Sequence, residues 1–137
     1  MYFRKEFAFL SNFYSSDITY NGEPFPTAEH AYQASKAVSK NDFQLIQSAT
    51  SPAQAKKLAR SISVRPNWNA IKRRVMREIL EEKFAIPHLR EKLLQVQEPI
   101  IEHNKHGDTY WGVCGGVGEN HLGKILTRIR NEIIVFS

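Results

Sequence analysis

Residues 27–36 read TAEHAYQASK, and this stretch decides how the chain is interpreted. It predicts the start of a helix. Pro26 breaks the preceding strand, Thr27 has the side chain of an N-cap, and Glu29 falls in the first turn, where the helix dipole favours an acid.

Glu29 and Lys36 are expected to share one helix face with Tyr32 or Gln33, because these positions recur at spacings of three, four and seven. At 1.5 Å per residue the carboxylate and the ammonium start roughly 10 Å apart. That separation exceeds an ion pair but suits a small substrate held between an anionic and a cationic end. The alternative is structural: Glu29 interacts favourably with the positive end of the helix dipole, Lys36 is a solvated surface lysine and Tyr32 belongs to the core.

Composition favours one folded domain over residues 1–137, since 42% of the residues are hydrophobic and eight are Phe. The single cysteine, Cys114, excludes an intrachain disulfide and fits a reducing compartment, so we expect a cytoplasmic protein without a membrane partner. The net charge of +5 has its densest cluster between Arg60 and Arg77. Such a cluster is either a solvated face or a surface that attracts phosphates.

Periodicity and capping signals predict an α+β domain, rich in helices (about six) with a small β element. A hairpin is expected at Ile18–Phe25, around the turn residues Asn21-Gly22. The expected helices are Ala28–Val38, Asp42–Ser48, Pro52–Ser61, Trp68–Phe84, His88–Val96 and His121–Phe136. Two further short strands are expected at Pro99–Glu102 and Thr109–Val113.

Three other segments carry polar groups in a suggestive context. Ser11 and Asn12 lie within an aromatic run that includes Phe13, which could enclose a flat base; a buried strand with an Asx turn is equally compatible. Asp108 could be a second carboxylate opposite Glu29, with Trp111 beside Gly112 as a stacking platform. His103 and His106 near Asp108 fit no standard zinc spacing, so we expect no metal and no cofactor.

The glycines at 115, 116 and 118 precede Asn120 and a helix, and such a loop can present backbone N–H groups to an anion. It lacks a P-loop lysine, and a flexible connector capped by Asn120 is the alternative. No thiol-enzyme signature surrounds Cys114, which favours a structural role.

These segments together resemble the NADAR superfamily and, within it, the YbiA-like N-glycosidases. The resemblance runs in order over nearly the whole chain. The matching residues are Leu10–Phe13; Glu29, His30, Gln33 and Lys36; Ser51, Pro52, Ala55, Lys56 and Arg60; Trp68, Val75 and Met76; Lys83 and Phe84; Glu102, Asp108, Trp111 and Gly112; Gly118, Asn120, Leu122, Gly123 and Arg130.

The resemblance implies cleavage of an N-glycosidic bond between a ribose carbon and a base nitrogen. Some YbiA-like enzymes act on phosphoribosyl pyrimidines of the early riboflavin pathway, and other NADAR proteins remove ADP-ribose from guanine in DNA. Two other classes compete with an enzyme: a binding module for nucleotide-like ligands, and a nucleic-acid-binding protein that uses residues 65–77.

We expect Glu29 to stabilise the positive charge that develops on the ribose, or to activate water. Asp108 is expected to bind ribose hydroxyls or relay protons. Lys36 is expected either to bind phosphate or to form a Schiff base. The expected substrate-binding residues are Ser11, Asn12, Phe13, Tyr32, Gln33, Trp111, Gly112, Gly118 and Asn120.

Overall fold

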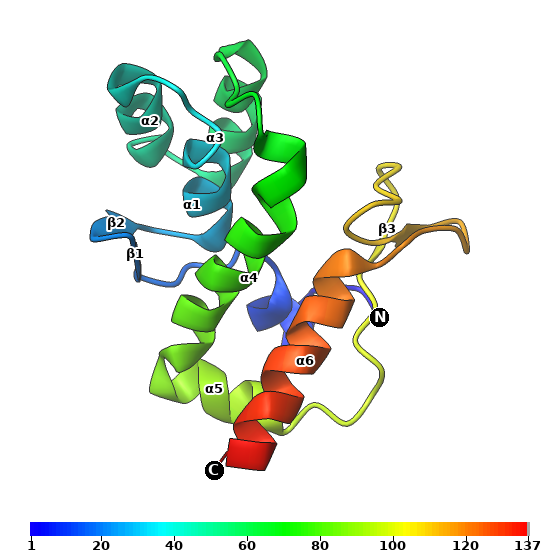
Figure 1. Cartoon of the computed structure of the whole chain (residues 1–137). Helices are drawn as coiled ribbons and strands as arrows, with labels where there is room; N and C mark the ends of the chain where they lie inside the picture. The colour runs from blue at the N-terminus through cyan, green and yellow to red at the C-terminus, as the bar shows by residue number, and fades with distance from the viewer. Residues whose placement is uncertain (137) are drawn as a thin grey trace. The chain divides into compact units, whose positions relative to one another are not determined.

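The computed structural model describes residues 1–136. Two compact units form, which we call the central unit, residues 12–83, and the terminal unit, residues 1–11 with the described residues from 84 onward. Helices dominate both units and each contains one two-stranded sheet (Figure 1). The α+β, helix-rich class predicted from the sequence is confirmed, whereas a single domain over residues 1–137 stays a prediction.

The central unit begins with a hairpin and continues with helices. Its elements are β1 (Ile18–Tyr20), β2 (Glu23–Phe25), α1 (Ala28–Ala34), α2 (Lys40–Gln47), α3 (Pro52–Leu58), the 3₁₀ turn η2 (Ala59–Ser61) and all but the last turn of α4 (Trp68–Ala85). The terminal unit contains the 3₁₀ helix η1 (Lys5–Leu10), α5 (Pro87–Leu94), β3 (His103–Asn104), β4 (Val113–Cys114) and α6 (His121–Phe136).

The β1–β2 hairpin confirms the turn prediction. Asn21 and Gly22 have φ angles of 51° and 79°, which is the left-handed pair that a type I′ turn requires. The strands pair antiparallel, with Ile18 opposite Phe25, and both of these side chains are buried. The buried hairpin thus fixes the position at which the chain enters α1, three residues after β2.

Helix α1 begins where predicted, and its start is held by side chains. Thr27 Oγ1 accepts a hydrogen bond from the backbone N–H of His30 at 3.1 Å and lies 2.7 Å from His30 Nδ1. His30 Nε2 lies 2.9 Å from the carbonyl oxygen of Ala49. Since a carbonyl oxygen only accepts, Nε2 donates to Ala49; in the neutral ring, Nδ1 then accepts from the threonine hydroxyl.

The same helix ends at Ala34, so the prediction of Val38 as its end is wrong. Ser35 Oγ donates back to the carbonyl of Ala31 at 2.7 Å, which competes with helix continuation. The carbonyl of Lys36 then accepts from the N–H of Arg65 at 2.9 Å. Lys36 therefore lies in a turn after the helix.

The next two helices begin at or near their predicted positions, and serine side chains cap both. The Ser39 hydroxyl accepts from the N–H of Asp42 at 3.1 Å, so α2 begins at Lys40 instead of the predicted Asp42. Helix α3 begins at Pro52, as predicted, and Ser51 is its N-cap. The last predicted turn of that helix tightens into η2.

The long helices supply most of the core. In α4 the buried apolar side chains are Trp68, Val75, Met76, Ile79, Leu80 and Phe84, and in α6 they are Leu122, Ile125, Leu126 and Ile129. Ile71 of α4 and Ile133 of α6 are only half-buried. No helix within residues 1–136 combines the length and apolarity that a membrane crossing requires.

The two predicted strands at Pro99–Glu102 and Thr109–Val113 are wrong. Instead, His103–Asn104 pairs in parallel with Val113–Cys114. The amide of Asn120 binds the backbone of residues 100 and 102, and Asp108 Oδ1 accepts from the N–H groups of residues 110 and 111. Side chains thus satisfy the backbone groups that a longer ladder would have used.

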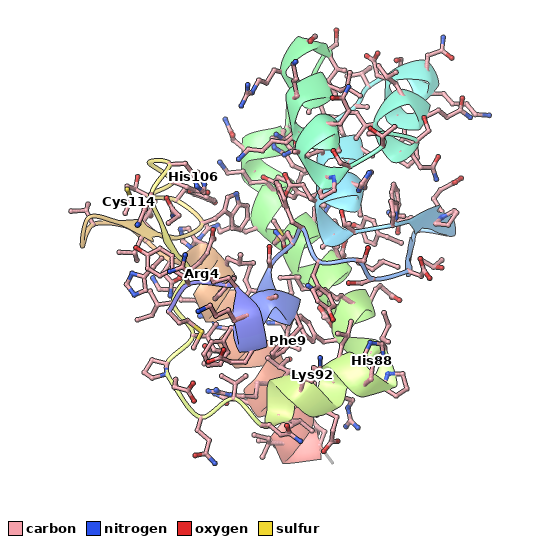
Figure 2. The ribbon with its side chains drawn as sticks, turned by 180° about the vertical axis from the view of Figure 1, so that it is seen from behind. Arg4, Phe9, His88, Lys92, His106 and Cys114 are labelled. Carbon is pink, nitrogen blue, oxygen red and sulfur yellow. The ribbon has the colours of Figure 1, made fainter. Side chains whose placement is uncertain are left out.

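The N-terminal segment forms η1 rather than the strand considered as an alternative. Its Phe9 ring meets Phe84 edge-on, with ring centroids 6.4 Å apart. The ammonium of Lys92, on α5, lies 5.7 Å from the Phe9 ring centroid, and both side chains are labelled in Figure 2. These contacts anchor the aromatic run within the terminal unit.

Candidate active site

Glu29 is the most deeply enclosed carboxylate of the central unit. Only 7% of the residue is exposed. Its Oε2 accepts a hydrogen bond from Gln33 Nε2 at 2.7 Å, one helical turn further on. Its backbone N–H donates to the carbonyl of Asn12 at 3.0 Å. The α1 start therefore holds Glu29, Gln33 and Asn12 together. Their roles as site residues stay predictions.

Burial raises the pKa of Glu29 above that of an ordinary glutamate, because desolvation disfavours the charged form. The hydrogen bond from Gln33 and the nearby charges of Lys56, Lys36 and His30 oppose this shift without cancelling it. A carboxylate with a raised pKa is a stronger base than a solvated one. Glu29 is thus suited to proton transfer at mild pH.

Two amide oxygens beside Glu29 have no hydrogen-bond partner within residues 1–136. They are Asn12 Oδ1 and Gln33 Oε1, and both are buried. The other end of each amide is in use, since Asn12 Nδ2 contacts the sulfur of Met76 at 3.5 Å and Gln33 Nε2 donates to Glu29. A buried acceptor without a donor is costly, so both oxygens suit a ligand that brings N–H or O–H groups.

Tyr32 and Lys36 lie next to each other after all, although Lys36 is beyond the helix. The Lys36 ammonium is 5.4 Å from the Tyr32 ring centroid, and the Tyr32 ring is 5.2 Å from the ring of Trp68 on α4. Burial lowers the pKa of Lys36, the charge of Glu29 opposes that change, and the charges of Lys56 and Lys72 reinforce it.

Lys56 and Lys72 were not predicted as site residues, although Lys56 is among the residues that match the family. Among the lysines, Lys56 has the larger effect on the pKa of Glu29, ahead of Lys36. Periodicity along the chain does not connect the two lysines, since Lys56 lies on α3 and Lys72 on α4. Half-burial next to an exposed basic neighbour distinguishes each of them, but only in the folded structure.

Phe13 and Ser11 are placed differently from Asn12. The Phe13 ring is 43% exposed, which leaves room for stacking on a ligand. Ser11 belongs to the terminal unit and its N–H caps η1 by donating to the carbonyl of Ala8 at 3.0 Å. A binding role for either side chain stays a prediction.

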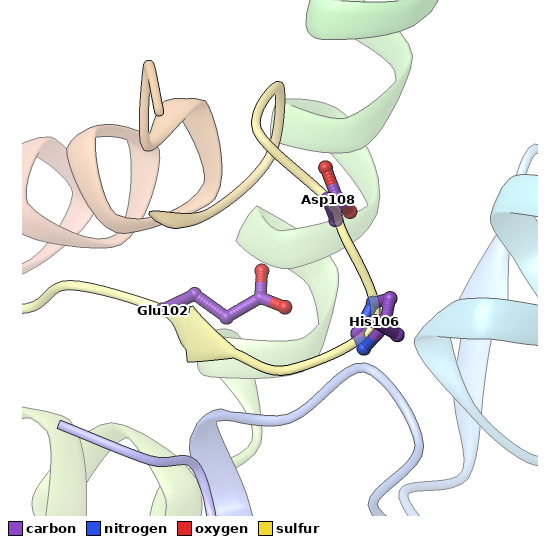
Figure 3. A group of neighbouring side chains, drawn as sticks. All are labelled: Glu102, His106 and Asp108. Atoms are coloured by element: carbon purple, nitrogen blue, oxygen red, sulfur yellow. The ribbon is translucent and has the colours of Figure 1, made fainter. Parts of the chain in front are cut away.

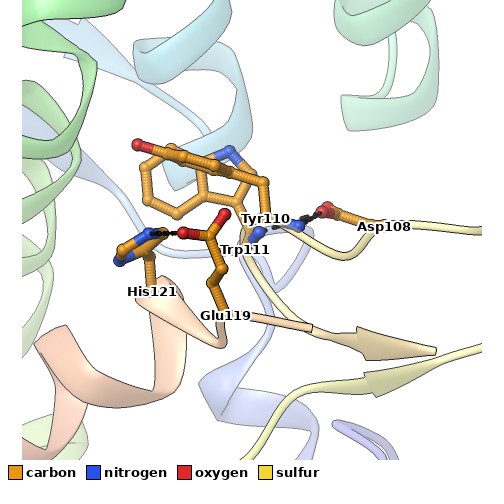
Figure 4. A network of polar contacts seen from close by, with 5 residues as sticks. All are labelled: Asp108, Tyr110, Trp111, Glu119 and His121. Carbon is orange, nitrogen blue, oxygen red and sulfur yellow. Dashed lines mark hydrogen bonds and ion pairs between the residues drawn. The ribbon is translucent and has the colours of Figure 1, made fainter. Parts of the chain in front are cut away.

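The remaining predicted residues belong to the terminal unit, where Asp108 organises a turn. Its Oδ1 accepts from the N–H groups of Tyr110 at 3.1 Å and Trp111 at 2.9 Å (Figure 4). Asn104, which was not predicted as a site residue, also stabilises this turn. Its Nδ2 donates to the carbonyl of Asp108 and its Oδ1 accepts from the N–H of Asp108. One oxygen of Asp108 is therefore committed to structure.

The Trp111 ring packs near the rings of Tyr110 and His121. Its ring centroid lies 4.9 Å from that of Tyr110, edge to face, and Tyr110 in turn lies 4.5 Å from the ring of His121. His121 Nε2 is 3.3 Å from the carboxylate of Glu119 (Figure 4). The predicted stacking role of Trp111 and the catalytic role of Asp108 stay predictions.

Gly112, Gly118 and Asn120 have structural tasks in the terminal unit. A Cβ on Gly112 would overlap the carbonyl oxygen of Glu102, and one on Gly118 would overlap the carbonyl oxygen of Gly112. Asn120 Oδ1 accepts from the N–H of Glu102 at 3.0 Å, and its Nδ2 donates to the carbonyl of Ile100 at 3.1 Å. Both ends of the Asn120 amide are thus engaged within the unit.

Gly112→Ala is expected to lower the free energy of unfolding by about 1–3 kcal/mol, as overpacking usually does. The added methyl group must displace the backbone of Glu102 or the amide of Asn104. Urea unfolding measures the change, with Val117→Ala, at an exposed position five residues further on, as the control. Unchanged stability combined with a raised KM would show that Gly112 serves the substrate and not the fold.

One group of side chains in the described residues could hold a cation. The donor atoms of Glu102, His106 and Asp108 all lie within 4.8 Å of one another (Figure 3). His106 is exposed, and Asp108 already accepts two backbone hydrogen bonds. We assign no metal to this group, and the expectation of a metal-free protein stays a prediction.

The sequence and the fold of this chain have counterparts among known proteins. The NADAR domain matches residues 2–134, so the chain belongs to the NADAR family. It also resembles the NMR structure of the E. coli protein YbiA, with a TM-score of 0.86 and 33% identity, over 99% of this chain and 85% of that one.

Curated relatives carry enzyme names. N-glycosidase YbiA of Escherichia coli (strain K12) is 34% identical over 131 residues, covering 92% of this chain and 81% of that protein. An N-glycosidase of Nostoc punctiforme is 36% identical, covering 90% and 84%. A riboflavin biosynthesis protein of Vibrio vulnificus is 37% identical over 91% of this chain but only 35% of its own length.

Proposed function

We propose that this protein is an N-glycosidase that hydrolyses the bond between a phosphorylated ribose and a base. The observation that carries the proposal is Glu29, a buried carboxylate with a raised pKa beside two amide oxygens that lack donors. Membership of the NADAR family and the names of the relatives support the same reaction class. A cytoplasmic location, in keeping with the single cysteine, is part of the proposal.

The chemistry places positive charge on the ribose as the C–N bond breaks. In our proposal the Glu29 carboxylate lies next to that carbon and lowers the energy of the transition state. It also takes a proton from the attacking water, which a carboxylate of raised basicity does well. The water oxygen becomes a sugar hydroxyl, and the proton taken up by Glu29 passes to the base nitrogen as the base leaves, which restores the carboxylate.

The neighbouring amides position the substrate. Asn12 Oδ1 and Gln33 Oε1 accept hydrogen bonds from ribose hydroxyls or from amino groups of the base, which removes the cost of their burial. The Gln33 amide also keeps the Glu29 carboxylate oriented. Phe13 stacks on the base, since its ring is partly exposed next to Asn12.

Lys36 acts in this scheme as a cation rather than as a nucleophile. Its ammonium lies over the Tyr32 ring and within electrostatic reach of Glu29, where it can hold a phosphate group of the substrate. Asn120 supports the loop backbone in the proposal, because its amide is already engaged, so any anion contact there would use backbone N–H groups.

Product analysis tests the function directly. The protein is incubated separately with phosphoribosyl pyrimidines of the riboflavin pathway and with DNA that carries ADP-ribosylated guanine, and the released base is measured by mass spectrometry. We expect release from the phosphoribosyl pyrimidines, in line with the names of the relatives. Release of the base only from the modified DNA would show that the substrate is ADP-ribosylated guanine in DNA and not a phosphoribosyl pyrimidine. Binding without release from either would reduce the protein to a binding module.

A further inference from the structure

Three half-buried lysines of the central unit are linked electrostatically to Lys36 or Glu29: Lys36 itself, Lys56 and Lys72. Lys36 follows α1, Lys56 lies on α3 and Lys72 lies on α4. Their immediate basic neighbours in sequence, Lys57 and Arg73, are exposed instead. The fold therefore separates an inward-facing set of cations from an ordinary solvated set.

Packing explains how three separate elements bring their lysines together. The Tyr32 and Trp68 rings meet at 5.2 Å and link α1 to α4. Lys36 contacts that pair through the Tyr32 ring. Lys72 follows Trp68 by four residues on α4, so it emerges on the same helix face.

The third lysine arrives on α3, which packs on α1 through small buried residues. Ala28 and Ala31 of α1 are fully buried, as is Ala55 of α3, and such small side chains permit close approach of the two helices. Lys56 comes directly after Ala55. In residues 1–136 it makes no ion pair, so no carboxylate in contact with it neutralises its charge.

The lysine charges affect the pKa values of Lys36 and Glu29. The charges of Lys56 and Lys72 both lower the pKa of Lys36, and the charge of Lys56 lowers that of Glu29 against the effect of burial. Lys36, Lys56 and an ionised Glu29 together carry one excess positive charge, and Lys72 adds to the positive potential at Lys36. Such a set of charges favours an anion, and a phosphate monoester carries about −1.5 to −2 at neutral pH.

We propose that Lys56 and Lys72, together with Lys36, bind the phosphate monoester on the substrate ribose and make the enzyme select phosphorylated over unphosphorylated ribosides. The inference rests on the proposed function and adds its specificity-determining residues. Half-buried cations grouped around Lys36, two of which also act on Glu29, fit a compact phosphate group better than an extended nucleic-acid backbone. A backbone contact would use the exposed cations Lys57, Arg60, Arg73 and Arg74.

Binding of the sugar itself tests this inference without any turnover. D-ribose 5-phosphate and D-ribose are titrated into the parent protein by calorimetry, and then into Lys56→Gln and Lys72→Gln. We expect the parent protein to prefer ribose 5-phosphate. Each substitution should weaken ribose 5-phosphate binding about ten- to a hundredfold, as the loss of a charged hydrogen bond does, and leave ribose binding unchanged.

Lys57→Gln and Arg73→Gln are the matched controls, since each removes one positive charge from the same helix on its exposed side. Circular dichroism verifies that all four variants fold. The inference is overturned if the controls weaken binding as much as the test variants, if the test variants bind like the parent protein, or if the parent shows no preference for the phosphorylated sugar. A preference without base release would leave this inference standing while the proposed reaction fails.

Discussion

Glu29→Gln should reduce kcat of the N-glycosidase reaction by about 10²–10⁴-fold or more, with substrate binding nearly unchanged. Glutamine keeps the shape of the side chain and can still accept the hydrogen bond from Gln33 Nε2. It cannot carry negative charge next to the ribose, and it cannot take a proton from water. Steady-state kinetics and calorimetric binding of the substrate to the variant measure the two effects separately.

Glu82→Gln, which changes an exposed glutamate of α4, is the control and should leave kcat as it is. In the parent protein kcat/KM should fall with acid at a pH above the ordinary glutamate range, because burial raises the pKa of Glu29 and protonation removes the base. Near-parental turnover in Glu29→Gln would exclude Glu29 from the mechanism.

The same substitution should stabilise the fold at neutral pH. A raised pKa in the folded state means that the protonated form is favoured there, so stability from this group is present at low pH and is lost as pH rises through the raised pKa. Glutamine avoids the cost of burying a carboxylate ion. An inactive but more stable variant is the signature of a residue kept for chemistry.

Lys83→Met should raise the free energy of unfolding by roughly 5 kcal/mol at pH 6, and by progressively less as pH approaches 10. Lys83 has no exposed surface, and burial lowers its pKa from 10.5 to about 7. At about 1.4 kcal/mol for each tenfold change in proton affinity, burial of the charged amine costs roughly that amount. Methionine fills a similar volume without a charge.

The sign of the pH dependence follows from the lowered pKa. Between pH 7 and pH 10.5 the unfolded chain keeps the Lys83 proton and the folded chain does not, so the parent gains stability as pH rises. Urea unfolding at pH 6, 7, 8 and 9 should show the variant and the parent converging. Lys92→Met, at an exposed position of α5, is the control. A difference that stays constant with pH would show that Lys83 keeps its proton in the fold.

The elements predicted correctly are those fixed by neighbours in sequence. Thr27 and Ser51 cap their helices with their own hydroxyls, and Asn21-Gly22 makes the hairpin turn by its backbone preference alone. The grouping of Asn12, Glu29 and Gln33 was predicted only in part. Helical spacing joins the last two, whereas Asn12 joins them through a backbone hydrogen bond from a distant segment.

The wrong predictions depend on contacts between distant residues. A strand was predicted at Pro99–Glu102, but the Asn120 amide binds the backbone of this segment, and the ladder forms directly after it, at His103–Asn104. Likewise, Lys56 and Lys72 have no distinguishing spacing in the chain. Only the packing of α3 and the Tyr32–Trp68 contact bring them into electrostatic reach of Glu29 and Lys36.

The placement of the two tryptophans gives each unit its own optical probe. Trp68 lies in the central unit against Tyr32, and Trp111 lies in the terminal unit against Tyr110. Replacing Trp111 by phenylalanine leaves one indole beside the lysine cluster, whose emission would respond to sugar phosphate. The converse replacement isolates the second indole, so a denaturation series followed in both variants reveals whether the halves melt together or in succession.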